Sequence, residues 1–197
     1  MPLWGKTETD ESKPKWLDNV NKVGLAEDCF ATEQGWVLRH YKGADKNTAR
    51  YWDEVLVAIG GLAGGTSTTA ALGEADITAV FFEQEALAQG DTGTVVVIYN
   101  EQVDVDTTGG TPTINVLGTV TGTVAASYAR GTGSNRLEFD FTVPSELTAQ
   151  DLSISGTDIA LNGGTIFDKG TSVASELAYT TILGAGGSGD DLVLTIA

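Results

Sequence analysis

The sequence predicts an all-β protein in which an N-terminal extended arm and a β-hairpin precede an antiparallel β-sandwich. Two observations lead to this fold class. From residue 75 onward, short apolar or alternating runs recur about every 8–15 residues without a helical period, a pattern typical of a sandwich. Charge and tryptophan are also divided unevenly along the chain, and a Gly- and Thr-rich stretch follows that division. The chain is therefore expected to have two parts with different roles.

The charge distribution gives the boundary between these parts. The 197 residues include 27 acids and 11 Lys and Arg, for a formal charge of −16. Residues 1–54 hold eight of the basic residues and all four Trp, and their net charge is −2. Residues 55–197 have a net charge of −14. We expect an extended arm and a β-hairpin at 1–60, a flexible Gly- and Thr-rich linker at 61–74 and a β-sandwich at 75–197.

The first part is expected to contain an arm and a hairpin. Residues 1–30 show no strong period, and Pro2 and Pro14 oppose a continuous helix. Residues 34–41 and 51–59 are β-rich runs on either side of a polar loop, which predicts a hairpin. Two strands alone are marginal in water, so this hairpin needs another surface or another copy of the chain.

The second part is expected to be a series of short strands. Its clearest signal lies at 137–143, where Leu, Phe, Phe and Val alternate with acidic residues and Thr, as on a strand with one buried face. The helix-like candidates, 83–88 and 145–150, are at most one or two turns long. The remaining predicted strands are 76–83, 94–99, 113–117, 123–128, 151–154, 158–161, 165–167, 177–183 and 192–196.

Three runs of this second part resemble a bacterial immunoglobulin-like repeat. They are VVVIYNEQVDVDTTGGTPTINV at 95–116, YARGTGSNRLEFDFTV at 128–143 and DLSISGTDIALNGGTIFDKG at 151–170. The resemblance covers roughly residues 75–197 and keeps the order of the repeat's elements. It departs from the repeat at 168–171, which affects the last loop. The resemblance implies an immunoglobulin-like sandwich used for adhesion, display or surface decoration, and rarely for catalysis.

Three sequence motifs of the first part resemble those of virion structural proteins of tailed phages, particularly marine myophages. They are MPLWGKTETDESKPKWL, ATEQGWVLRHY and YWDEVLVAIGGL. This resemblance covers about 60 residues and implies a particle-attachment module that carries a variable outer domain. It also implies a location in the virion, which is assembled in the cytoplasm of the bacterial host.

Together the two resemblances lead to a hypothesis of capsid decoration, or cement. The first part would bind the major capsid protein or other virion proteins in many copies, and the acidic domain would face outward. We expect Trp4, Trp16, Trp36 and Trp52 to anchor the interface, with Lys13, Lys15, Arg39 and Arg50 meeting acidic or polar groups. The arm's Trp residues could equally pack on the domain that follows. The alternative function is a neck, tail or fibre protein whose outer domain binds the host or carbohydrate.

Other classes of function receive little support from the residues. The one histidine, His40, has no nucleophile and orienting carboxylate nearby in sequence, and Cys29 cannot form an internal disulfide. We therefore expect no enzyme and no cofactor. The acidic balance opposes nucleic-acid binding, and no apolar run is long enough to span a membrane. Glu101, Asp104 and Asp106 are candidate Ca²⁺ ligands, although we favour solvated charges on a strand face as the explanation of these residues.

Overall fold

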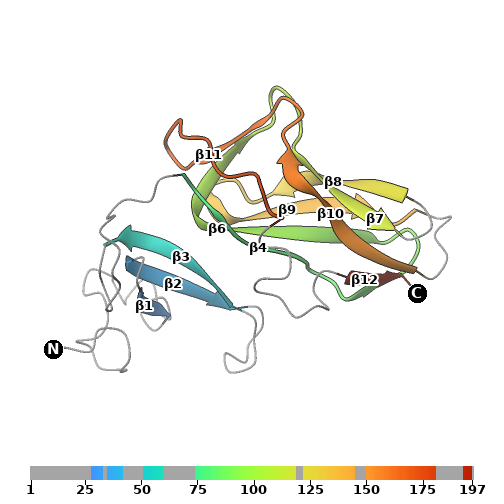
Figure 1. The fold of residues 1–197 in the computed structure, drawn as a ribbon, viewed down its shortest axis with the longest axis horizontal. Helices are drawn as coiled ribbons and strands as arrows, with labels where there is room; N and C mark the ends of the chain where they lie inside the picture. The colour runs from blue at the N-terminus through green and yellow to red at the C-terminus, as the bar shows by residue number, and fades with distance from the viewer. Residues whose placement is uncertain are drawn as a thin grey trace. The chain divides into compact units, whose positions relative to one another are not determined.

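The computed structural model describes residues 28–32, 35–41, 51–59, 74–118, 122–144, 150–180 and 193–196. The chain divides into two compact units, 1–73 and 74–197, and each is considered by itself. Every regular element in the described ranges is a β-strand (Figure 1), so the predicted all-β class is confirmed. Within these ranges no helix is long and apolar enough to cross a membrane. Residues 1–27 of the predicted arm and most of the predicted linker lie outside the described residues.

The first unit contains a three-stranded antiparallel sheet with the order β1-β2-β3. Strands β2 (Gly35–Tyr41) and β3 (Tyr51–Ala58) form the predicted hairpin. Strand β1 (Cys29–Thr32) pairs with β2 and was not expected from the sequence. Gly35, between β1 and β2, has φ +136°, and a Cβ there would lie 2.0 Å from Val57 O. Only glycine fits this close approach of two backbones.

The second unit contains nine strands, and most of them match predicted runs. The prediction was wrong at 83–88, which holds a short strand instead of a helix-like turn, and the runs at 151–154 and 158–161 belong to one strand. The strands are β4 (Ile77–Phe82), β5 (Ala86–Leu87), β6 (Thr92–Asp106), β7 (Thr113–Gly118), β8 (Gly122–Arg130), β9 (Ser134–Thr142), β10 (Gln150–Ala160), β11 (Thr165–Asp168) and β12 (Val193–Ile196).

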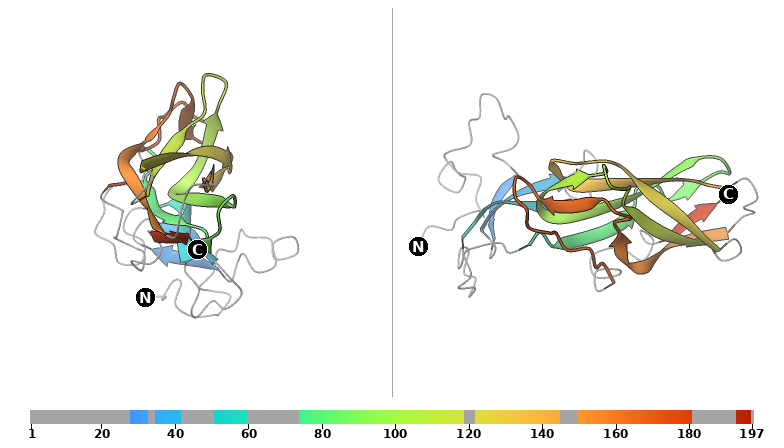
Figure 2. Two further views of the ribbon diagram at one scale, coloured as in Figure 1. Left: turned by 90° about the vertical axis from the view of Figure 1, so that its right-hand side faces the viewer. Right: turned by 90° about the horizontal axis from the view of Figure 1, so that it is seen from above.

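These strands form one continuous hydrogen-bonded sheet with the order β11-β6-β9-β8-β7-β10-β12-β5, and β4 also pairs with β6. The sheet is mixed, because β12 and β5 pair in parallel, which corrects the wholly antiparallel prediction. β4 and β5 are separated by residues 83–85 only. One short chain segment therefore pairs at both ends of the sheet, so the sheet must curl around its core (Figures 1 and 2).

The strand β8 lies where the sheet bends. Its residues 122–127 pair with β7, and its residues 127–130 pair with β9. The strand β6 has partners along its whole length, since β4 pairs with its residues 95–99 and β11 with its residues 103–106. The order of neighbours thus falls into two groups, β4-β6-β9-β8 and β8-β7-β10-β12-β5.

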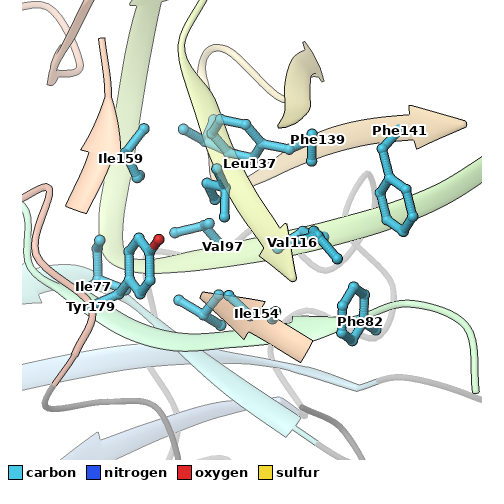
Figure 3. Close-up of a cluster of buried hydrophobic side chains, with 14 of the residues drawn as sticks. Ile77, Phe82, Val97, Val116, Leu137, Phe139, Phe141, Ile154, Ile159 and Tyr179 are labelled. Atoms are coloured by element: carbon cyan, nitrogen blue, oxygen red, sulfur yellow. The ribbon is translucent and has the colours of Figure 1, made fainter. Parts of the chain in front are cut away.

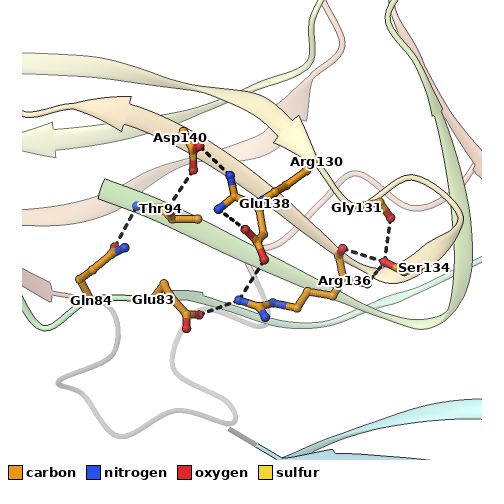
Figure 4. Close-up of polar contacts among 9 residues, drawn as sticks. All are labelled: Glu83, Gln84, Thr94, Arg130, Gly131, Ser134, Arg136, Glu138 and Asp140. Carbon is orange, nitrogen blue, oxygen red and sulfur yellow. Dashed lines mark hydrogen bonds and ion pairs between the residues drawn. The ribbon is translucent and has the colours of Figure 1, made fainter. Parts of the chain in front are cut away.

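The inner face of the curled sheet holds the apolar core. On β9, Leu137, Phe139 and Phe141 point into this core (Figure 3), as the alternating pattern predicted, while the intervening charged residues point outward. On the outer face, Arg136 Nη2 lies 2.7 Å from Glu83 Oε2 and 3.1 Å from Glu138 Oε1 (Figure 4). The pair with Glu83 links β9 to the end of β4 across β6, where Val96 and Ile98 are fully buried.

Candidate functional site

An arginine held by a carboxylate and two aromatic rings is the centre of one face of the first sheet. Arg39 on β2 faces Asp53 on β3 in the strand register. Arg39 Nε donates to Asp53 Oδ1 at 2.8 Å, and Nη2 donates to Oδ2 at 2.9 Å. This two-bond pairing raises the pKa of the Arg39 guanidinium above its usual range, although burial opposes the effect. The charge of Arg39 is therefore matched within the sheet.

Two aromatic residues fix the guanidinium from either side. Its Cζ lies 3.9 Å from the centroid of the Tyr51 ring and 5.0 Å from that of Phe30. Such cation–π contacts are each worth roughly 0.5–2 kcal/mol. The Tyr51 ring also lies 6.4 Å from the Tyr41 ring at a tilted angle. Because Tyr51 is 54% exposed, this ordered group of rings is accessible at the surface of the sheet.

The opposite face of the same sheet carries a histidine and a second carboxylate. Alternate residues of a strand point to opposite faces, so His40 and Trp52 lie behind Arg39. His40 Nε2 lies 2.8 Å from Glu54 Oε2, and the His40 and Trp52 rings stack with centroids 5.9 Å apart. Glu54 is only 7% exposed. These contacts fix the register of the hairpin from its second face.

The first unit also exposes apolar side chains on β3 and just after it. Val57 on β3 and Ile59 just after it are 41% and 38% exposed. The register shift between residues 36 and 37 pairs Val57 with Trp36, so Val57 lies on the face opposite Arg39. On the Arg39 face, a polar group with matched charges beside the exposed Tyr51 ring is suited to binding a protein surface. We call Tyr51 and the Arg39–Asp53 pair the β3 surface.

The structure places three of the eight predicted interface residues. Trp36 is 7% exposed, and its role in an interface stays a prediction. Trp52 and Arg39 are half-buried, with the contacts described above. Their role in an interface stays a prediction. Trp4, Lys13, Lys15, Trp16 and Arg50 lie outside the described residues.

The three candidate calcium ligands lie on β6, and two of them are engaged in separate hydrogen bonds. Asp104 Oδ2 accepts from Gly170 N at 3.1 Å, and Asp106 Oδ1 accepts from the amide and hydroxyl of Thr108. Those bonds lower the pKa of Asp106. Glu101 Oε1 is buried and has no hydrogen-bond partner among the residues that the structure describes. Within the described ranges no group of three or more His, Cys, Asp and Glu is arranged to hold a metal ion.

Sequence reasoning missed Phe30, Tyr51, Asp53 and Glu54 as parts of this surface. A signal for Asp53 was present, because a hairpin that pairs Tyr41 with Tyr51 also pairs Arg39 with Asp53. No comparable signal existed for Phe30, since β1 is only four residues long. No family model matches the chain, and no similarity to a curated protein or to a solved structure is found. The function is therefore argued from the residues themselves.

Proposed function

We propose that the chain is a virion structural protein that attaches to a phage capsid through its first unit and displays its acidic second unit outward. The observation that carries this proposal is the β3 surface, an accessible aromatic ring beside a charge pair that is already matched. Such a surface can be buried in an interface with little desolvation of unpaired charge. The resemblance of the first 60 residues to phage virion proteins supplies the kind of partner.

The topology of the second unit supports an immunoglobulin-like sandwich as the displayed domain. In that fold one sheet holds strands A, B, E and D, and the other holds C, F and G. If β4, β6, β7, β8, β9, β10 and β12 are lettered A to G in chain order, the neighbours β4-β6-β9-β8 and β7-β10-β12 reproduce these two sets. The segment β4–β5 then passes from the first sheet to the second, and β8 joins them.

The charge of the second unit supports its outward position. It contains 17 acidic residues and only three basic ones, Arg130, Arg136 and Lys169. Two of these are already occupied: Arg130 pairs with Glu138 and Asp140, and Arg136 pairs with Glu83 and Glu138 (Figure 4). Densely displayed copies would therefore repel one another and remain soluble.

The test is incorporation of the chain into purified particles. The copy number per major capsid protein is measured by quantitative mass spectrometry for the wild type and for Tyr51→Ala. Truncation of an aromatic residue that dominates an interface costs about 2 kcal/mol or more. When the chain is supplied below saturation, we therefore expect the number of copies per particle to fall at least roughly tenfold. The control is Lys169→Ala on the second unit, which should incorporate normally.

Three results bear on this proposal. Hundreds of wild-type copies per particle would support capsid decoration, whereas a few copies would support the neck or tail alternative. Normal incorporation of Tyr51→Ala together with Trp4→Ala and Trp16→Ala would show that the first unit is not the attachment module. Wild-type chain that never copurifies with particles would refute both virion assignments.

A further inference from the structure

The chain enters the second unit through residues 74–77, and the backbone of this segment is bonded to three separate parts of that unit. The first bond runs from Ala75 N to Asp168 Oδ1 at 2.9 Å. The Asp168 carboxylate also accepts from Ser175 Oγ at 3.1 Å, and Asp168 is 7% exposed. A buried carboxylate that accepts two hydrogen bonds holds its donors more strongly than a neutral acceptor would. Ala75 itself is fully buried.

The second connection is reciprocal and joins Asp76 to Asn100 in the middle of β6. Asp76 N donates to Asn100 Oδ1 at 2.9 Å, and Asn100 N donates to Asp76 O at the same distance. Asn100 Nδ2 also lies 3.3 Å from Asp76 Oδ2. Asn100 is 3% exposed, and its side-chain oxygen, its side-chain nitrogen and its backbone N–H all form hydrogen bonds inside the protein. Two residues 24 positions apart are thereby linked three times.

The third connection joins the entry segment to residue 176, beyond β11. Ile77 N donates to Glu176 Oε2 at 3.2 Å, and Glu176 N donates to Ala75 O at 2.8 Å. The carbonyl of Glu176 accepts in turn from the hydroxyl of Tyr99 on β6 at 2.9 Å. The segment that contains Glu176 is thus fastened to the entry on one side and to the central strand on the other.

We propose that these contacts form an entry clamp, which keeps the start of β4 closed until the whole second unit unfolds and resists a pull transmitted along the preceding chain. The beginning of a strand usually frays, because its first amides lack ladder partners. Here the amides of residues 75, 76 and 77 all donate to side chains from three different segments. That the start of β4 stays closed is inferred from these hydrogen bonds alone. That a pulling force acts on this segment rests on the proposed attachment to a particle.

The mechanical argument follows from the order in which bonds are loaded. A force that reaches the second unit through residue 74 acts on the amides of 75–77 before it acts on the pairs between β4 and β6. The acceptors lie on three segments, so the bonds share the force and do not open one after another. Loss of one of them should therefore speed opening of the entry more than it speeds unfolding of the core.

Amide hydrogen exchange of the full-length chain tests the closure. In the wild type, peptides covering 75–77 should exchange as slowly as those covering 94–99 on β6, because both open only by global unfolding. Asp168→Ala should accelerate exchange at 75–77 by about tenfold relative to β6. Asp168→Asn keeps an Oδ1 acceptor and should largely restore protection. Wild-type amides at 75–77 that exchange at least roughly tenfold faster than those of β6 would overturn the clamp.

Force spectroscopy of the same full-length chain, held at its two ends, tests the resistance to pulling. The control is Tyr179→Phe, which removes a 2.7 Å hydrogen bond to Ser155 O elsewhere in the unit. At a fixed force, Asp168→Ala should raise the unfolding rate of the second unit about tenfold above that of Tyr179→Phe. If Asp168→Ala does not fold, the pair Glu176→Ala and Glu176→Gln replaces it. Equal rates for clamp and control variants would show that these contacts are merely structural. Because both measurements use isolated protein, their failure would be separate from failure of particle attachment.

Discussion

Replacing Glu101 with Gln should make the second unit more stable at neutral pH, because the change removes a poorly solvated charge from the folded protein. Glu101 Oε1 is buried without a hydrogen-bond partner in the described part of the chain. Burial first, and then the carboxylates of Asp168 and Asp76, raise the pKa of Glu101. At neutral pH the folded protein therefore holds a carboxylate that is poorly solvated and close to two others. Glutamine has the same shape, no charge and an NH₂ group that can donate to either neighbour.

The size of the effect follows from the burial of this side chain. An unsatisfied buried polar group costs about 1–3 kcal/mol. Glu101 is only partly buried, and solvent screens its repulsion by neighbouring charges, so the lower end of that range applies. We expect Glu101→Gln to raise the free energy of unfolding by about 1 kcal/mol. For a unit of this size, that corresponds to an increase of roughly 3 °C in Tm.

The pH dependence of this gain has a defined sign. An unfolded Glu has a pKa of about 4.3, and the folded pKa of Glu101 is higher. The folded state therefore binds this proton more tightly. The resulting stabilisation is present below the unfolded pKa and is lost as pH rises through the folded pKa. The advantage of Glu101→Gln over the wild type should accordingly be largest at pH 7 and shrink as the pH approaches 4.

Differential scanning calorimetry of the full-length chain between pH 4 and pH 7 measures both quantities. The matched control is Glu85→Gln, which removes the same charge from an exposed side chain and separates the local effect from the change in net charge. Glu85→Gln should change Tm little at either pH. The reasoning would be refuted if Glu101→Gln were no more stable than Glu85→Gln at pH 7, or if its gain were independent of pH.

Three further predictions concern other parts of the molecule. Burial raises the pKa of Tyr99, so its contribution to stability is present below the unfolded pKa of about 10 and is lost as pH rises above that value. Tyr99→Phe should therefore reduce the loss of stability above pH 10, measured by urea unfolding. At pH 7 the same change should cost about 1 kcal/mol, because it removes the bond to Glu176 O. Gly35→Ala would place a Cβ 2.0 Å from Val57 O and should unfold the first sheet. The readout is Trp fluorescence emission, because all four Trp lie in residues 1–54. Gly90→Ala, in the second unit, adds a Cβ with nothing within 4 Å of it and should leave that emission unchanged. A chelator should not change the Tm of the second unit, because no group of three or more His, Cys, Asp and Glu among its described residues is arranged to hold a metal ion; a decrease in Tm would revive the calcium hypothesis.

Sequence patterns predicted the strands of this protein well because side-chain alternation is a local property. The alternation at 137–143 identified which side of β9 faces the core, and the structure confirms it for Leu137, Phe139 and Phe141. The hairpin of β2 and β3 was also predictable, since its two runs are close in sequence. By contrast, β10 was predicted as two runs, because the exposed residues 156–158 interrupt its apolar pattern. Gly156 adopts φ +97° there and the pairing with β7 shifts register, yet the strand continues.

The sequence by itself thus determined the β class, most strand positions and the division between a near-neutral part and an acidic part. Only the tertiary structure decided which strands are neighbours, because pairing depends on contacts between residues far apart in the chain. The bond between Ala75 and Asp168 spans 93 positions, and no local pattern in either segment indicates it. The parallel pairing of β12 with β5 likewise follows from the closure of the whole sheet. The burial of Glu101 Oε1, which has no hydrogen-bond donor among the described residues, has the same origin.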